Sequence, residues 1–199
     1  FDFEEVVNNG TKWTTLKCGK AVPGKAPPHL SALTPIVYKN KDNQCLWAAS
    51  SCGLATIEGY EVMAEKVFDV GKKINLMPMD LRKQFNALRK VINTAGRKCG
   101  KGFIEIPGGK YGSGLDRGLR RKNPVVVSIF GKLDGKKIHL RHCVCFVGNI
   151  VLDPNLDFAM VISKESMDYI CNNIQPGASY GGILKSFELV LKKEWRLAK

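Results

Sequence analysis

The sequence predicts an α+β fold, in which helices come first along the chain and a mostly antiparallel sheet follows. Apolar residues recur at helical spacing in the first half of the chain, and short apolar runs separated by turn residues fill the second half. Of the 199 residues, 44% are hydrophobic, so a single domain with a buried core is expected. We expect it to span residues 1–199, with an irregular N-terminal segment over 1–35, a helical half over about 36–100 and a sheet half over about 101–199.

Helical patterns cover most of the helical half. The proline-free run CLWAASSCGLATIEG begins at Cys45, with Asp42 and Asn43 as N-caps just upstream, and residues 60–70 continue helical. The run PMDLRKQFNALRKVINTAG, which Gly96 closes, is amphipathic. Its apolar stripe consists of Leu81, Phe85, Leu88 and Ile92, and its opposite face carries Arg82, Lys83, Arg89 and Lys90.

Strand patterns cover most of the sheet half. Asp134 and Gly135 favour a tight turn, so the strands that flank them are expected to form a hairpin. The glycine-rich run PGGKYGSG lacks the order GxxxxGK[ST] of a phosphate-binding loop, so a nucleotide site is not favoured. The expected strands are 103–106, 124–130, 142–148, 150–153 and 186–193, and the expected helices of this half are 115–122 and 163–172.

Positive charge is concentrated in the middle of the chain. The formal net charge is +13, and residues 71–141 alone carry 18 basic and 4 acidic side chains, a net charge of 18 − 4 = +14. Such a segment favours binding to nucleic acid, an anionic membrane or an acidic protein surface. A solvated helix surface is the alternative, because no aromatic side chains interleave these charges. No apolar run is long enough to span a bilayer, so no membrane span is expected.

The seven cysteines lack the pattern of a disulfide framework or a zinc site. Their number is odd, their spacing does not repeat and no signal peptide precedes them, so free thiols in a reducing compartment, the cytoplasm or nucleus, are expected. Cys143 and Cys145 form the only close pair and lie in an expected buried strand, so no metal site is expected. The chain does not begin with Met, which favours a piece processed from something longer.

Cys45 has the position of a nucleophilic thiolate. It begins an expected helix, where unpaired N–H groups and the positive end of the helix dipole stabilise an anion. Trp47 is expected to wall one side of a substrate cleft beside it. Cys52, in the middle of the same helix, is expected to be a core residue.

His142 is the expected base. It begins one strand and Asp153 ends the next, so strand pairing can bring the carboxylate beside the imidazole and hold the required tautomer. His139 and His29 have no such companion and are expected on the surface. A thiolate, an imidazole and a carboxylate together indicate acyl-transfer chemistry.

The blocks NQCLWAAS, RHCVCFVG and VLDPN resemble the Cys, His and Asp/Asn blocks of the papain-like superfamily of cysteine peptidases. The loop KNKDNQCLW also resembles the Cys loops of picornaviral leader proteases and OTU deubiquitinases. The resemblance covers residues 36–156 in outline. It implies a papain-like fold, in which a central Cys-bearing helix packs on an antiparallel sheet or half-barrel, and a catalytic triad of Cys45, His142 and Asp153 with no cofactor.

The chain departs from papain around the oxyanion hole. Papain has Cys directly before Trp and a glutamine six positions upstream, whereas here Leu46 follows Cys45 and Lys39 stands at the glutamine position. In the leader-protease-like alignment Asn40 takes the oxyanion role, and Gln44 is the fallback together with the Cys45 backbone N–H.

These observations predict a cysteine endopeptidase that acts on a protein or polyprotein substrate, as the protease domain of a viral or transposon polyprotein. A deubiquitinase with the same triad ranks second, because the basic segment would repel the basic recognition face of ubiquitin. The alternative from another class is a nucleic-acid-binding module whose Cys and His blocks are only core, which predicts binding that weakens steeply with salt.

Overall fold

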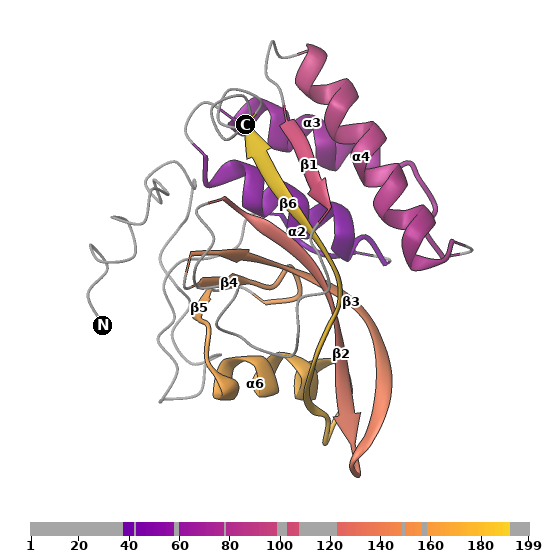
Figure 1. Cartoon of the computed structure of the whole chain (residues 1–199), viewed down its shortest axis with the longest axis vertical. Helices are drawn as coiled ribbons and strands as arrows, with labels where there is room; N and C mark the ends of the chain where they lie inside the picture. The colour runs from indigo at the N-terminus through magenta and orange to yellow at the C-terminus, as the bar shows by residue number, and fades with distance from the viewer. Residues whose placement is uncertain are drawn as a thin grey trace.

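The structure is a computed structural model, and it describes residues 38–41, 43–57, 60–77, 79–98, 103–107, 123–148, 150–156 and 159–191. In this part of the chain the fold is α+β, as predicted (Figure 1). The expected N-terminal segment 1–35 and the expected helix 115–122 lie outside the described residues. The helices are α2 (Cys45–Ala55), α3 (Glu61–Gly71), α4 (Leu81–Lys98) and α6 (Lys164–Ile174), and the strands are β1 (Phe103–Pro107), β2 (Val125–Leu133), β3 (Lys136–Val147), β4 (Ile150–Leu152), β5 (Met160–Val161) and β6 (Ser179–Leu191).

The described strands form one six-stranded antiparallel sheet in the order β1-β6-β2-β3-β4-β5. The expected hairpin between β2 and β3 is confirmed, with Asp134 and Gly135 at φ values of 50° and 75°, the signs that a type I′ turn requires. β6 begins at Ser179, earlier than the expected 186, because it pairs with β2 as far as Lys132. The glycines in its first half weaken the strand pattern there.

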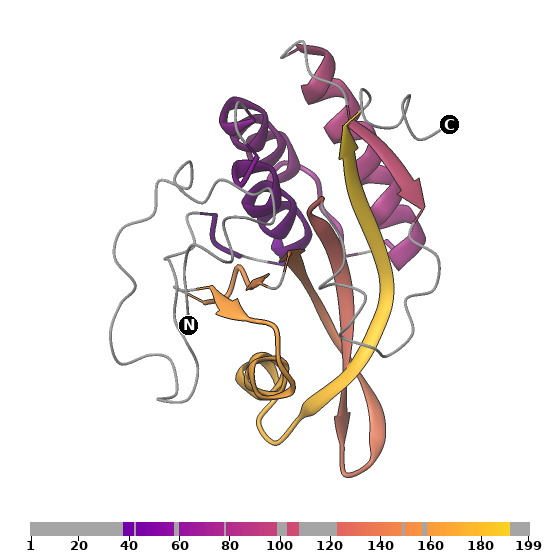
Figure 2. The ribbon, with the colours of Figure 1, turned by 60° about the vertical axis from the view of Figure 1, so that its left-hand side comes forward.

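The two faces of the sheet contact different helices. Because successive strand residues point to opposite faces, Cys143 and Cys145 of β3 belong to the hydrophobic core that includes α2, α3 and α4, whereas Val144 and Phe146 belong to the core that includes α6. Figure 2 shows α2, α3 and α4 together over one part of the sheet and α6 apart from them. The face that meets α2 is the one that carries the candidate site.

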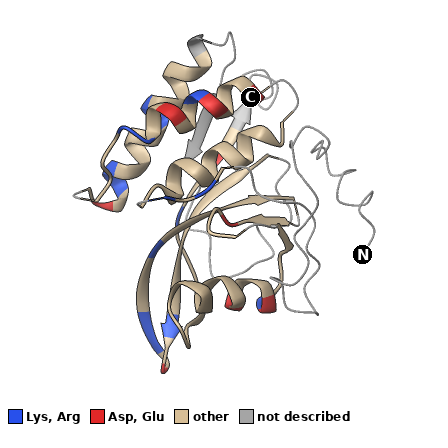
Figure 3. Cartoon of the chain, turned by 180° about the vertical axis from the view of Figure 1, so that it is seen from behind, with Lys and Arg blue, Asp and Glu red and all other residues tan. Residues whose placement is uncertain are grey.

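The expected stripe of α4 is confirmed. Phe85, Leu88 and Ile92 are buried and Leu81 is half-buried, while the four basic residues of the opposite face are exposed (Figure 3). The helix continues two residues past Gly96 to Lys98. Lysines also gather at the tip of the β2–β3 hairpin, so the positive charge lies in more than one region. Among the described residues no helix is long and apolar enough to cross a membrane.

A β-bulge interrupts the β2–β3 ladder where the sheet meets the start of α2. Ile129 pairs with His142 and Gly131 pairs with Ile138, so three residues of β3 lie opposite one residue of β2 between these two pairs. Arg141 lies inside this bulge with a φ of 50°. Bulges redirect side chains and often occur beside active sites. This one lies directly before His142.

Candidate active site

Cys45 is the first residue of α2, and its side chain is only 7% exposed. The first hydrogen bond of the helix runs from the Ala48 N–H to the Gln44 carbonyl, so the N–H groups of the preceding positions have no partner within the helix. The first turn contains no acidic residue, and Gln44 makes no side-chain cap. The positive end of α2 is therefore available to stabilise negative charge at Cys45.

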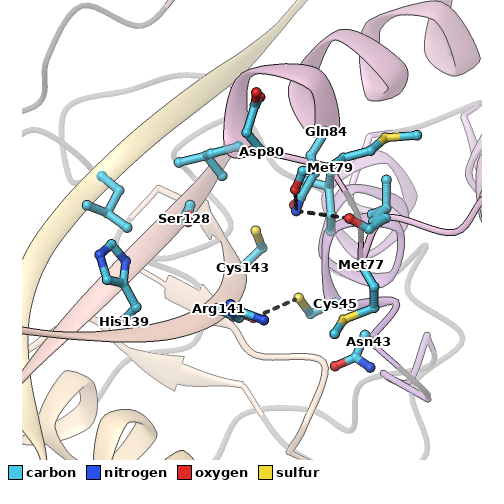
Figure 4. A pocket seen from close by; sticks show the side chains of 14 residues that line it. Asn43, Cys45, Met77, Met79, Asp80, Gln84, Ser128, His139, Arg141 and Cys143 are labelled. Carbon is cyan, nitrogen blue, oxygen red and sulfur yellow. Dashed lines mark hydrogen bonds between the residues drawn. The ribbon is translucent and has the colours of Figure 1, made fainter.

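Cys45 lies in a cleft of about 350 Å³ between the start of α2, the start of α4 and the sheet (Figure 4). The cleft is mostly apolar on the α4 side, where Gln84 donates hydrogen bonds to the Leu76 and Met79 carbonyls and so holds the loop before the helix. Volume and lining suit a large side chain or a short extended peptide. The cleft is lined by Asn43, Cys45, Leu46, Leu76, Met77, Met79, Asp80, Leu81, Gln84, Ser128, His139, Arg141, Cys143 and Leu184.

The structure brings His142 and Asp153 together. His142 Nε2 lies 2.7 Å from Asp153 Oδ1, and the two side chains are 3% and 0% exposed. The same Asp153 oxygen accepts the Asn155 N–H at 2.9 Å, which fixes the carboxylate. Because Nε2 is engaged by Asp153, Nδ1 is the ring nitrogen left to serve Cys45.

The electrostatics of the pair favour an imidazolium. Burial alone lowers the pKa of His142, but the charge and hydrogen bond of Asp153, together with the hydrogen bond and charge of Cys45, outweigh it and raise this pKa to about 10. A protonated His142 in a buried position thus has a carboxylate on one side and a sulfur on the other.

The electrostatics of Cys45 favour a thiolate. A hydrogen bond with Cys143 is the largest influence and lowers the pKa of Cys45, burial opposes it, and the hydrogen bond and charge of His142 lower it further. The net result is a Cys45 pKa well below its ordinary value. When protonated, the thiol can donate to the Arg141 carbonyl at 3.7 Å. A thiolate–imidazolium pair is the chemical state that this arrangement stabilises.

The two predicted oxyanion residues have partners outside the cleft. Asn40 donates its side-chain N–H to Asn155 Oδ1 at 2.7 Å, and its backbone N–H bonds the Pro154 carbonyl at 2.9 Å. Gln44 donates to the Lys72 carbonyl at 3.3 Å. Asn40 thus lies against the loop that carries Asp153. The asparagine that lines the cleft beside Cys45 is Asn43.

Trp47 does not wall the cleft. Its side chain is 0% exposed and packs against α3, where a Cβ on Gly71 would come within 2.4 Å of the indole ring. The reason is helix geometry, because residues two apart point in nearly opposite directions around the axis. Leu46 takes the place beside the cleft.

The remaining predicted residues divide between core and surface. Cys52 is buried at 2% exposure, as expected, and His139 is exposed at the rim of the cleft. His29 lies outside the described residues. The five cysteines of the described part are free, and no three His, Cys, Asp or Glu side chains within it are grouped to hold a metal ion.

Sequence reasoning missed Asn43, Ser128 and Cys143 as cleft residues. The adjacency of Cys143 to His142 was a signal for that cysteine. Nothing in the sequence indicated that Ser128 would be the residue of β2 that pairs with Cys143.

Comparisons of the chain with family models, with curated proteins and with solved structures find no match. The case for a function therefore depends on the geometry and electrostatics of this site.

Proposed function

We propose that the chain is a cysteine peptidase with a catalytic triad of Cys45, His142 and Asp153. The observation that supports the proposal most directly is the buried His142. Its Nε2 lies within hydrogen-bond distance of Asp153 Oδ1, and Cys45 forms a hydrogen bond with the same ring. The lowered pKa of Cys45 at a helix N-terminus supports the role of nucleophile. Buried ionisable groups in mutual contact, as Cys45, His142 and Asp153 are here, are typical of functional sites.

The proposed reaction begins with attack of the Cys45 thiolate on a substrate carbonyl. His142 gives its Nδ1 proton to the leaving amine, and the acyl-enzyme is then hydrolysed by water that His142 deprotonates. Asp153 stabilises the imidazolium and keeps its orientation. The backbone N–H of Cys45 and the side chain of Asn43 are the donors proposed for the oxyanion, in place of Asn40.

The fold of the described residues is compatible with a papain-like architecture, which we include in the proposal. The buried helix α2 starts with Cys45 and packs on β3, and the base and the carboxylate follow from β3 and the end of β4. This arrangement supports the same division of roles that the three sequence blocks imply.

The test uses the pH dependence of Cys45 alkylation, read by mass spectrometry, and cleavage of a peptide library. We expect Cys45 to be alkylated faster than the other thiols at about pH 6, and we expect this faster alkylation to be lost in His142→Ala. The variant Cys45→Ala should not cleave any peptide that the wild type cleaves. Slow alkylation of Cys45 at that pH, or cleavage by Cys45→Ala, contradicts the proposal.

A ubiquitin probe with an electrophilic C-terminus separates a peptidase from a deubiquitinase. Exposed Arg82, Lys83 and Arg141 lie on or beside the cleft elements, so we expect a basic ubiquitin surface to be disfavoured. The expected result is no labelling of Cys45. Rapid labelling would instead assign isopeptide substrates to the same triad.

Binding of nucleic acid is a second candidate function, favoured by α4. This helix carries six basic and no acidic residues, and its described basic side chains are exposed. We expect binding of a labelled oligonucleotide that weakens steeply with salt. Changing Arg82, Lys83 and Lys90 to Gln should weaken it, whereas the matched change of Lys132, Lys136 and Lys137 at the hairpin tip should not. Equal losses, or no binding, would refute a role for α4.

A further inference from the structure

We propose that Cys143 is a positioning residue for the nucleophile, oriented by Ser128, so that a relay of hydrogen bonds from Ser128 through Cys143 holds Cys45 Sγ in the cleft. The inference rests on the proposed function and adds two residues that the Cys45–His142–Asp153 triad does not include. A thiol that donates to a neighbouring thiolate stabilises the ionised form, as any hydrogen bond to an anion does.

The sheet register juxtaposes the two additional residues. Ser128 of β2 and Cys143 of β3 are direct partners in the antiparallel ladder, so their side chains lie on the same face. That face meets α2, and both side chains are 3% exposed where they line the cleft with Cys45 (Figure 4). A polar hydroxyl buried in this position needs a hydrogen-bond partner.

The surroundings of the two thiols decide which of them ionises. Cys45 lies at the positive end of α2 beside His142, whereas Cys143 is buried in β3 with no positive group among the influences on its pKa, so Cys143 keeps its proton and donates to Cys45. The bond with Ser128 lowers the pKa of Cys143, so the Ser128 hydroxyl donates to the Cys143 sulfur. The relay therefore ends at the sulfur that would attack the substrate.

Other titratable and charged groups also face Cys45. His142 acts on it directly, and His139, Arg141 and the Asp80 carboxylate line the same cleft from β3 and from the start of α4. His142 also forms a hydrogen bond with Cys45, but it is a separate group from the Cys143 thiol and is unchanged when that thiol is removed. The effect of Cys143 is therefore separable from theirs by substitution.

Cys145 provides a matched control in the same strand. It lies two residues further along β3, faces the same helices and is fully buried against Gly53 of α2. Burial is the largest cause of its raised pKa, and Cys45 is not among the causes. Removing the Cys145 thiol should disturb β3 about as much as removing that of Cys143, without touching the relay.

The experiment measures the rate of Cys45 alkylation by iodoacetamide against pH in the full chain. The variants are Cys143→Ala, Cys143→Ser, Ser128→Ala and Cys145→Ala, each checked for folding by circular dichroism. We expect Cys143→Ala to slow the reaction at about pH 6 by roughly tenfold or more, with the rate at high pH retained, because one pKa unit is a tenfold change in thiolate. Cys143→Ser keeps a donor and should restore most of the rate, and Ser128→Ala should give a smaller loss in the same direction.

The outcomes separate this inference from the proposed function. A reactive wild-type Cys45 whose pH profile is the same in Cys143→Ala and in Cys145→Ala leaves the peptidase proposal standing and overturns the relay. A wild-type Cys45 that reacts no faster than the other thiols overturns the peptidase proposal first. If Cys143→Ala does not fold, Ser128→Ala and the serine rescue decide, and an unchanged profile in both refutes the relay.

Discussion

His142 Nε2 and Asp153 Oδ1 lie 2.7 Å apart, in a position from which solvent is almost entirely excluded. His142 lies in β3, and Asp153 directly follows β4, the strand that pairs with β3. The Asp153 charge therefore acts on the imidazole with little screening by water. This contact raises the pKa of His142, and His142 is in turn one of the groups that lower the pKa of Cys45.

Asp153→Asn should lower the pKa of His142 from about 10, because the charge that opposes burial is removed while the side-chain shape is kept. With a neutral imidazole at pH 7 the Cys45 thiolate loses its counter-charge. We expect turnover to fall on the order of 10²–10⁴-fold. An NMR titration of the His142 ring protons checks the pKa, and a ring still charged at pH 8 would contradict the expectation.

Stability should depend on pH in a way that reports the Cys45–His142 pair. The pKa of His142 rises on folding from 6.5, and that of Cys45 falls from 9.0. Over the part of the range from pH 6.5 to 9.0 that lies above the lowered pKa of Cys45, the folded pair and the unfolded pair therefore each bind one proton, so this pair adds no slope to the unfolding free energy. Above pH 9.0 the unfolded pair binds fewer protons than the folded pair, so the stability that the pair contributes decreases as the pH rises towards the folded pKa of His142.

In Cys45→Ala the free energy of unfolding should instead fall as the pH rises over this range. The folded variant still holds a proton on His142, whose pKa Asp153 raises, while the unfolded chain loses that proton above pH 6.5. The histidine's contribution is then complete below 6.5 and is lost as pH rises through the folded pKa. Urea unfolding of wild type and variant across this range measures the difference. Parallel curves would show that the two groups do not interact.

Asn43→Gly should lower kcat on the order of 10²–10³-fold with little change in KM, because one proposed oxyanion donor is removed. Glycine accepts the φ of 64° at this position, so the backbone is not strained. Steady-state kinetics on a cleaved peptide measure the effect. Asn40→Ala is the comparison, because Asn40 donates to Asn155 instead, and a larger kcat loss there would return the oxyanion role to Asn40.

Gly71→Ala should destabilise the fold by about 1–3 kcal/mol, since a Cβ there would lie 2.4 Å from the buried Trp47 ring. The gain in helix propensity, about 1 kcal/mol, offsets only part of this. The measurement is the urea midpoint. In a Trp47→Leu background the same substitution should cost clearly less, and an equal cost in both backgrounds would exclude the indole contact as the cause.

Local sequence patterns predicted the type and order of most described elements, and the two-residue strand β5 is the one that they missed. The stripe of α4, the turn at Asp134 and Gly135 and the start of α2 at Cys45 are encoded by residues close together in the chain. The expected start of a strand at His142 is wrong, because β3 already begins at Lys136, where it pairs with β2 across the hairpin, and His142 lies inside it after the bulge. The approach of Asp153 to His142 was predictable, because Asp153 directly follows β4, which pairs with β3.

Tertiary structure decided which side chains share the cleft. Trp47 lies in the core, Asn43 rather than Asn40 lines the cleft, and Ser128 stands opposite Cys143. Each of these depends on strand register or on the direction a helix face points, and a shift of one residue reverses a side chain's face. Such relationships are set by packing between elements distant in sequence, which no short pattern records.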